Sequence, residues 1–220
     1  MLLTRYGIRE WLSATLVAAV AGGAFVWMGW WPAVAIVAVV WLAAAMFFRD
    51  PLRRLPRDLA PGAMLSPADG RISAVDRVEH HDAAGGPAVV IRIFLSVLDV
   101  HVNRSPCDGE VVGLTYTRGR FHDARSPECP RENESQLVTV RLEGGRTIGI
   151  RQIAGKLARR IVCDLKAGDR LTRGRRYGMI KFGSSTELIL PRELVAEIHV
   201  SEGDRVKGGV TVLATVAKNM

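Results

Sequence analysis

Residues 177–191, Tyr-Gly-Met-Ile-Lys-Phe-Gly-Ser-Ser-Thr-Glu-Leu-Ile-Leu-Pro, place a Gly-Ser pair between two strand-like runs. The first run covers 177–182, and the second begins directly after the pair. Glycine tolerates sharp backbone bends, so a bend at Gly183 would bring the Ser184 hydroxyl against the Gly183 carbonyl. Gly-Ser-Ser is also ordinary turn chemistry. The stretch therefore predicts β structure around either a plain turn or a chain that cuts itself.

Short apolar segments of the same kind recur on the N-terminal side of this stretch, at 88–95, 136–142, 147–153 and 159–163. Alternating and β-branched residues in runs of this length are typical of strands. Gly and Asp-Gly dipeptides punctuate them, and no long amphipathic helix pattern is evident. We therefore predict that residues 63–220 form one mostly β domain.

One turn sequence occurs twice within this domain. Residues 167–174 recur 35 positions later as 202–209, in the form Gly-Asp-x-apolar-x-x-Gly. The turn resembles those of lipoyl and biotinyl carrier domains and related barrel-sandwich folds. No lysine lies in the hairpin context of a swinging-arm carrier. The repeat therefore predicts a compact barrel-sandwich-like fold with quasi-symmetric halves, without carrier function.

The N-terminal segment has the composition of a membrane anchor. Residues 11–48 contain no charged side chain and hold all five tryptophans. As one helix they would measure roughly 57 Å at 1.5 Å per residue, nearly two bilayer crossings of about 20 residues. Trp30-Trp31-Pro32 in the middle favours a turn at an interface. We predict a membrane segment 1–48 that forms a helical hairpin, either spanning the bilayer or dipping into one leaflet.

Charge indicates the partner and the side of the membrane. Residues 49–220 carry 28 basic and 21 acidic side chains, an excess that suits an anionic surface. Lipid fits better than nucleic acid, because this part has no tryptophan and no aromatic-rich basic stripe. Arginines lie before the hairpin and in the Arg/Pro-rich linker 49–62 after it. The positive-inside rule therefore predicts a cell-membrane protein with its β domain on the cytoplasmic face.

The three cysteines, Cys107, Cys129 and Cys163, are widely spaced and form no C-x-x-C pair. A disulfide framework or a zinc site is therefore not expected. We predict unpaired thiols without a chemical role.

Two further motifs accompany the Gly-Ser-Ser run. They are 66–70, Ser-Pro-Ala-Asp-Gly, and 94–106, Phe-Leu-Ser-Val-Leu-Asp-Val-His-Val-Asn-Arg-Ser-Pro. In this order, behind an apolar N-terminus, the three motifs resemble the phosphatidylserine decarboxylase family in its short, membrane-associated bacterial and archaeal branch. The resemblance extends from 47–51, Phe-Phe-Arg-Asp-Pro, nearly to the C-terminus.

The resemblance implies a proenzyme that is cut between Gly183 and Ser184 into chains 1–183 and 184–220. Ser184 would become a pyruvoyl group, which forms a Schiff base with the amine of phosphatidylserine and accepts electrons as carbon dioxide leaves, as pyridoxal does elsewhere. The product would be phosphatidylethanolamine. The resemblance implies neither a metal nor a nucleotide cofactor. It implies a heterodimer of the two cleavage chains, and it leaves homo-oligomers open.

Two further residues match the family's catalytic positions. His101 is the predicted acid/base group, because histidine titrates near neutral pH. Asp69 matches the aspartate that orients the histidine, although Asp-Gly is also common in turns. Longer family members carry a second histidine three positions after the first, where this chain has Arg104. This departure puts the part of His101 in self-cleavage in question.

Several polar residues around these positions have open assignments. Arg104, together with Lys181, is a candidate for holding the substrate carboxylate or phosphate, and the alternative is that Arg104 is a surface charge. His122 is the second candidate base. His80 and His81 lie in a Gly-rich loop region and are predicted to be solvated.

Two noncatalytic functions compete with this interpretation. A membrane-anchored barrel-sandwich adaptor would share the Gly-Asp turns, but it predicts a single anchor and long coiled-coil helices. An anionic-lipid-binding module needs no cleavage at Ser184. Both predict an intact chain.

Overall fold

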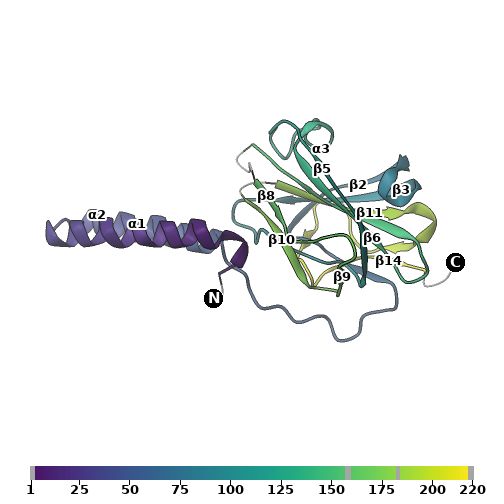
Figure 1. The fold of residues 1–220 in the computed structure, drawn as a ribbon, viewed down its shortest axis with the longest axis horizontal. Helices are drawn as coiled ribbons and strands as arrows, with labels where there is room; N and C mark the ends of the chain where they lie inside the picture. The colour runs from purple at the N-terminus through teal and green to yellow at the C-terminus, as the bar shows by residue number, and fades with distance from the viewer. Residues whose placement is uncertain (1–2, 157–159, 182–183, 218–220) are drawn as a thin grey trace. The chain divides into compact units, whose positions relative to one another are not determined.

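The structure is a computed structural model that describes residues 3–156, 160–181 and 184–217. The chain divides into two compact units, residues 1–52 and 53–220. The first unit is helical and the second is mostly β (Figure 1). The predicted fold class is confirmed.

The first unit is the predicted helical hairpin. Helix α1 covers Ile8–Trp27 and helix α2 covers Trp31–Phe47. Gly29 lies in the turn between them with φ 72°, a conformation that glycine adopts without strain. Residues Arg5–Trp27 have the length and apolar composition of a membrane-crossing helix, with a mean hydropathy of 1.4. Helix α2 is more apolar than α1 but shorter, at 17 residues.

The second unit contains fourteen strands within the described residues. They are β1 Ala63–Leu65, β2 Gly70–His81, β3 Gly86–Leu95, β4 Val102–Arg104, β5 Gly109–Thr117, β6 Ser135–Arg141, β7 Thr147–Ile153, β8 Arg160–Cys163, β9 Arg170–Leu171, β10 Arg176–Lys181, β11 Ser184–Pro191, β12 Val195–Ile198, β13 Arg205–Val206 and β14 Val212–Val216. The longest helix in the described part of this unit is α3, Cys129–Glu132. The long helices that an adaptor would need are therefore not found in the described residues.

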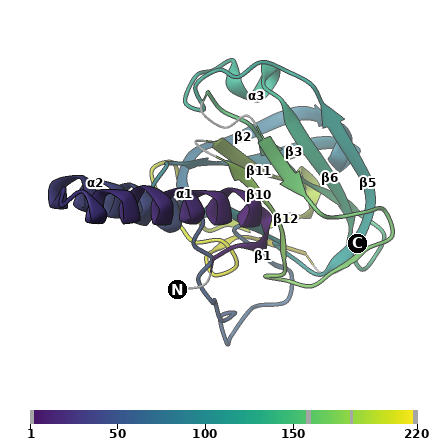
Figure 2. The same cartoon turned by 60° about the vertical axis from the view of Figure 1, so that its left-hand side comes forward.

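The strands form one large antiparallel sheet and two small ones. The large sheet has the order β13-β2-β3-β11-β7-β6-β5-β9, and the small sheets have the orders β1-β14-β12 and β4-β10-β8. The large sheet curls around the core (Figure 2). The order is symmetric about the centre of the sheet. Strands β2, β3 and β11 in one half correspond to β5, β6 and β7, respectively, in the other. One half of the unit therefore combines β1–β3 with β11–β14, and the other half is β4–β10.

Backbone hydrogen bonds repeat across the two halves. The Leu65 amide donates to the Pro106 carbonyl over 2.9 Å. The equivalent Arg104 amide donates to the Pro67 carbonyl over the same distance. The quasi-symmetric halves predicted from the Gly-Asp turns are confirmed.

The Gly-Asp turns themselves close each half in the same way. The Gly168 amide donates to the Val111 carbonyl over 2.7 Å, and the Gly203 amide donates to the Ile72 carbonyl over 2.8 Å. Each turn thereby fixes a short strand, β9 or β13, on the edge of the large sheet.

The hydrophobic core lies on the inner face of the large sheet. Most of its largest fully buried side chains come from β11 and the two strands that flank it, β3 and β7: Ile91, Ile93, Leu95, Ile148, Ile150 and Leu188. Tyr177 of β10 and Ile72 of β2 complete the set. The three strands at the centre of the sheet are therefore the most firmly packed elements of the unit.

Candidate active site

The predicted cleavage point lies where the chain passes from one sheet to another. Strand β10 ends at Lys181 in a small sheet, and β11 begins at Ser184 in the middle of the large sheet. Gly183, the other side of the predicted cut, lies outside the described residues. Ser184 faces Leu95 at the end of β3 in the ladder. The residue predicted to react is therefore the first residue of a strand that is paired on both sides.

The Ser184 side chain is buried without a partner. Its residue exposure is 0%, and Oγ has no hydrogen-bond partner among the described residues. Leaving a buried hydroxyl unsatisfied costs about 1–3 kcal/mol. Such groups in native structures call for an explanation, and a chemical role is one of the few available.

A buried polar network lies directly beside this position. Thr186, two residues along the same face of β11, accepts a hydrogen bond from Asn103 Nδ2 over 3.1 Å. Asn103 Oδ1 in turn accepts one from Gln152 Nε2 over 2.9 Å. All three residues are 0% exposed. The network ties β4 of the small sheet to β11 and β7 of the large sheet, and so it fixes the start of β11.

Sequence reasoning did not single out these three residues. Asn103 lies inside the motif that contains His101, and its position two residues from the histidine in a strand could have marked it as a neighbour on the same face. Thr186 and Gln152 carried no signal, since their roles depend on the pairing of β11 with β7.

His101 is buried beside β10, the strand of the small sheet that precedes Ser184. Its exposure is 0%, and its Nδ1 lies 2.9 Å from the Asp99 carbonyl. A carbonyl only accepts, so this contact places a proton on Nδ1, and Nε2 is the acceptor of the neutral ring. The His101 carbonyl accepts from the Ile180 amide over 3.3 Å. His101 therefore lies against the end of β10, just before the predicted cut.

Asp69 is held by an arginine of the linker. Arg53 donates through both Nη atoms to the two Asp69 oxygens, each over 2.5 Å. The Gly208 amide donates to Asp69 Oδ1 over 2.8 Å. Both side chains of the ion pair are largely buried, at 11% and 14% exposure. The orienting role of Asp69 toward His101 stays a prediction, because the imidazole contact described above goes to Asp99.

The other half of the unit holds a second copy of the Asp69 segment. Ser-Pro-x-Asp-Gly occurs at 66–70 and again at 105–109. Asp108 accepts from the Arg173 amide over 2.9 Å, as Asp69 does from Gly208. The sequence contained this repeat, and sequence reasoning missed it. Its two copies show that the amide contact belongs to the fold, whereas the buried ion pair with Arg53 is particular to Asp69.

The two candidate cations for substrate binding are both buried. Arg104 is 4% exposed, and its Nη1 donates to the Gly174 carbonyl over 3.3 Å. The alternative that Arg104 is a surface charge is therefore wrong. Lys181 is 7% exposed at the end of β10, where it faces Arg160 of β8 in the ladder. Lys181 thus lies next to the chain connection that leads to Ser184, whereas Arg104 pairs with Arg176 at the opposite end of β10.

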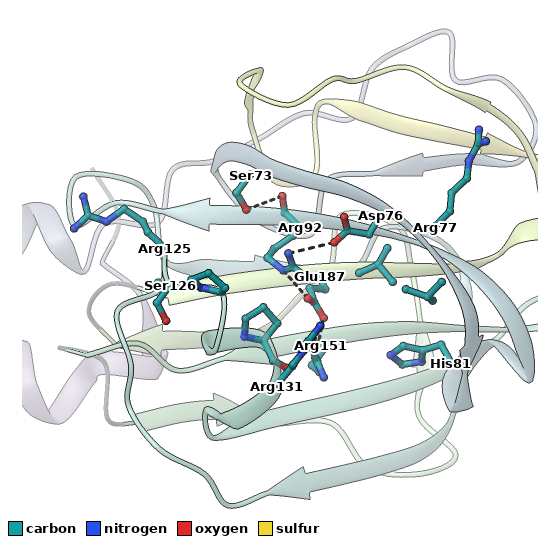
Figure 3. A pocket seen from close by; sticks show the side chains of 15 residues that line it. Ser73, Asp76, Arg77, His81, Arg92, Arg125, Ser126, Arg131, Arg151 and Glu187 are labelled. Atoms are coloured by element: carbon teal, nitrogen blue, oxygen red, sulfur yellow. Dashed lines mark hydrogen bonds and ion pairs between the residues drawn. The ribbon is translucent and has the colours of Figure 1, made fainter.

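The outer face of the large sheet carries a separate cleft of about 810 Å³ (Figure 3). At its floor, Glu187 is 1% exposed and accepts from Arg92 Nε and Arg151 Nε, each over 2.8 Å. Residues alternate between the two faces of a strand, so Glu187 and Ser185 lie on the outer face of β11 while Ser184 points inward. The ion pairs clamp β11 between β3 and β7.

The remaining histidines divide between surface and cleft. His80 is exposed and lies 3.1 Å from Asp82, as predicted. His81 is half-buried in the cleft, so its predicted solvation is wrong. Burial and the nearby Arg151 lower the pKa of His81. His122 lies 3.1 Å from Glu132.

The cysteine thiols are poorly reactive, in line with the prediction. Burial raises the pKa of Cys107 to about 12 and that of Cys129 to about 11. Both are therefore protonated at neutral pH and are poor nucleophiles. Within the described ranges, no group of three or more His, Cys, Asp or Glu side chains is arranged to hold a metal ion.

Comparisons with known proteins agree on one family. Residues 42–214 match the family model described as phosphatidylserine decarboxylase. A phosphatidylserine decarboxylase proenzyme of Rhodopirellula baltica is 44% identical over 214 residues, which cover 96% of this chain and 86% of that protein. The proenzyme of Symbiobacterium thermophilum is 44% identical over 183 residues, covering 83% of both chains. That of Burkholderia multivorans is 41% identical over 201 residues, covering 91% and 88%.

Proposed function

Since the chain belongs to the phosphatidylserine decarboxylase family, we propose that it cuts itself between Gly183 and Ser184 and converts phosphatidylserine into phosphatidylethanolamine and carbon dioxide. The observation that carries the proposal is the buried Ser184 hydroxyl at the start of β11, which has no hydrogen-bond partner within the described part of the chain. A pyruvoyl group made from Ser184 would supply the electron sink for decarboxylation.

Self-cleavage begins with Ser184 Oγ attacking the Gly183 carbonyl carbon while a base takes the hydroxyl proton. The acyl group moves from nitrogen to oxygen, which frees the Ser184 amine and leaves an ester. Loss of the Ser184 α-hydrogen then expels the carboxylate of residue 183 and leaves dehydroalanine. Its imine tautomer takes up one water and releases ammonia, which leaves the pyruvoyl group at residue 184.

His101 is the proposed proton carrier. The Asp99 carbonyl holds the Nδ1 proton, and Nε2 is then able to accept a proton and later return it to the substrate α-carbon. Asp69 is proposed as the positioning residue for this imidazole. Arg104 and Lys181 are proposed to hold the carboxylate or the phosphate of the substrate, since both are buried cations.

The topology supports a stable two-chain product. The chain 184–220 would contain β11, β13 and β14, which pair with β3 and β7, with β2, and with β1 of the longer chain. Cutting before Ser184 removes none of these ladders. The two chains are therefore proposed to remain together as a heterodimer with the new N-terminus held in place.

The hairpin is proposed to anchor the enzyme in the cell membrane with the β unit in the cytoplasm. Arginines flank the hairpin at both ends, as the positive-inside rule requires. A cysteine introduced at Arg57 should resist labelling by a membrane-impermeant reagent in intact cells until the membrane is permeabilised. Ready labelling of intact cells would place the unit on the other side.

The test of the proposed function is the mass of the purified full-length protein. We expect chains 1–183 and 184–220, with the second chain blocked to Edman sequencing and lighter than its serine form by one ammonia. Ser184→Ala should stay uncut and should not decarboxylate phosphatidylserine in mixed vesicles. A wild-type preparation that stays full-length while it decarboxylates the lipid would refute self-processing. An intact, inactive chain that binds anionic vesicles would favour the binding module.

A further inference from the structure

The loop that joins β3 to His101 exposes two aliphatic side chains. Strand β3 ends at Leu95, the residue that faces Ser184 in the ladder. The chain then turns through residues 96–99, where Val97 is 46% exposed and Leu98 is 82% exposed. Nothing in the proposed chemistry uses this pair, yet it lies shortly after Leu95, the ladder partner of Ser184, and shortly before His101.

The turn is held rigidly in this conformation. Asp99 Oδ2 accepts hydrogen bonds from the Ser96 amide over 2.8 Å and from the Ser96 hydroxyl over 2.7 Å. The Asp99 amide donates back to the Ser96 carbonyl over 2.9 Å. The Asp99 carbonyl also fixes His101. The turn that presents Leu98 to the outside is therefore the same turn that positions the imidazole.

The opposite end of the large sheet is built differently. There β6 and β7 are joined by a hairpin turn of Glu143, Gly144 and Gly145, all exposed. An exposed aliphatic pair thus marks the Ser184 end, and a polar turn marks the far end. Two exposed cations, Lys156 and Arg160, lie in the segment that follows β7 from the Ser184 end, and Arg160 faces Lys181.

Exposed aliphatic side chains and cations at one end of a domain are the composition of surfaces that lie in the interface of a bilayer. We propose that Val97 and Leu98 insert into the lipid interface and hold the Ser184 end of the sheet against the membrane surface. The proposal rests on the proposed function for the choice of substrate. A lipid headgroup could then reach the start of β11 while its acyl chains stay in the bilayer.

Contact with lipid is measured on the full-length protein in nanodiscs of phosphatidylcholine and phosphatidylglycerol. A polarity-sensitive fluorophore is attached at Leu98→Cys and, as the matched control, at Glu143→Cys, with the labelled wild type as background for the native thiols. Spin-labelled lipid should quench the fluorophore at 98 and leave the one at 143 unchanged. Equal quenching at both sites, or none at 98, would overturn the proposal. Protection of the 98 label that disappears on dilution would show that the loop contacts a second copy of the chain. That result would also overturn the proposal.

The labelling is repeated in Ser184→Ala, which needs no self-processing. Quenching at 98 in this variant is expected, because the contact does not depend on cleavage. If the wild type never cleaves or turns over lipid but its 98 label is quenched, the proposed function fails and the membrane contact stands. If the wild type decarboxylates lipid but the 98 label is not quenched, the contact fails and the proposed function stands.

Turnover supplies a second readout. Leu98→Asp should lower decarboxylation of phosphatidylserine in bilayers by about tenfold or more, the factor expected from losing the burial of one leucine side chain. Self-cleavage and turnover of a soluble short-chain phosphatidylserine should stay within about twofold, as for other surface changes. Leu98→Met, which keeps the apolar side chain, should behave as the wild type. An equal loss on soluble and bilayer substrate would contradict the membrane role.

Discussion

The two halves of the β unit differ most at equivalent ends of the large sheet. In one half, β6 and β7 are joined by a tight hairpin in which the Leu142 amide donates to the Arg146 carbonyl over 2.8 Å. In the other half, the equivalent neighbours β3 and β11 meet at Leu95 and Ser184 with no turn between them. The whole of β4–β10 is inserted there instead. The candidate active site therefore occupies the place of a missing hairpin turn.

This difference bears on the proposed cut before Ser184, which would lie inside the large sheet. A cut in the β6–β7 hairpin would open an exposed surface turn. The connection before Ser184 joins two sheets, so cutting it separates no strand from its neighbours. Polar side chains also replace nonpolar residues in this half: His101, Asn103 and Arg104 correspond to Gly62, Met64 and Leu65 of the other half. The shared framework supplies the strand pairing, and the unshared residues include those proposed to supply the chemistry.

The sharpest test of this contrast is His101→Ala. A positioned acid/base group typically contributes about 10²–10⁴-fold in rate. We expect a loss in that range for decarboxylation, with a nearly unchanged thermal transition and slow self-cleavage surviving. Stopped assays of carbon dioxide release and timed denaturing gels measure the two steps. His122→Ala is the control, and it should keep about wild-type rates. If His101→Ala matches the wild type in both steps, His122 becomes the next candidate.

A second test asks whether strand pairing alone holds β11 in the large sheet, since no hairpin turn joins it to β3. Glu187→Gln removes the buried charge that neutralises Arg92 and Arg151, and breaking a buried ion pair costs about 3–5 kcal/mol. The free energy of unfolding in denaturant should fall by that amount. The mature two-chain form should also lose chain 184–220 at lower denaturant than the wild type does. Glu110→Gln, which removes an exposed pair with Arg141, should change little.

A third test compares the two copies of Ser-Pro-x-Asp-Gly. Asp69→Asn should slow processing or turnover by about 10- to 100-fold, the loss expected from removing one or two charge-assisted hydrogen bonds. Asp108→Asn, at an aspartate whose side chain is 68% exposed, should stay within about twofold. A chemical role and a structural one separate in the pH–rate profile. If Asp69 orients His101, losing the negative charge of Asp69 lowers the pKa of the imidazole. The limb of the pH–rate profile that reports His101 then moves to lower pH. If Asp69 only holds Arg53, the thermal transition falls and the limb stays.

The sequence predicted the elements of this site better than their arrangement. The Gly-Asp turns gave the quasi-symmetric halves, and the motif order singled out Ser184, His101 and Asp69, since each depends on local residue types. The buried network through Thr186 and Gln152 depends on which strands pair in space, and no local pattern determines that. The burial of Arg104 and the ion pair of Asp69 with Arg53 depend on packing between distant segments in the same way.

The smallest expected effect is that of Ser185→Ala. Ser185 follows the reacting residue but lies on the outer face of β11, where its hydroxyl donates to the Ala124 carbonyl over a long 3.4 Å. A hydrogen bond of this kind contributes at most about 1 kcal/mol. We therefore expect the variant to cleave itself to completion with a rate within about fivefold of the wild type, whereas Ser184→Ala stays uncut. Timed denaturing gels of both variants measure the contrast. A folded Ser185→Ala that stays full-length would show that the outer face of β11 takes part in the cut, and the division between its two faces would have to be abandoned.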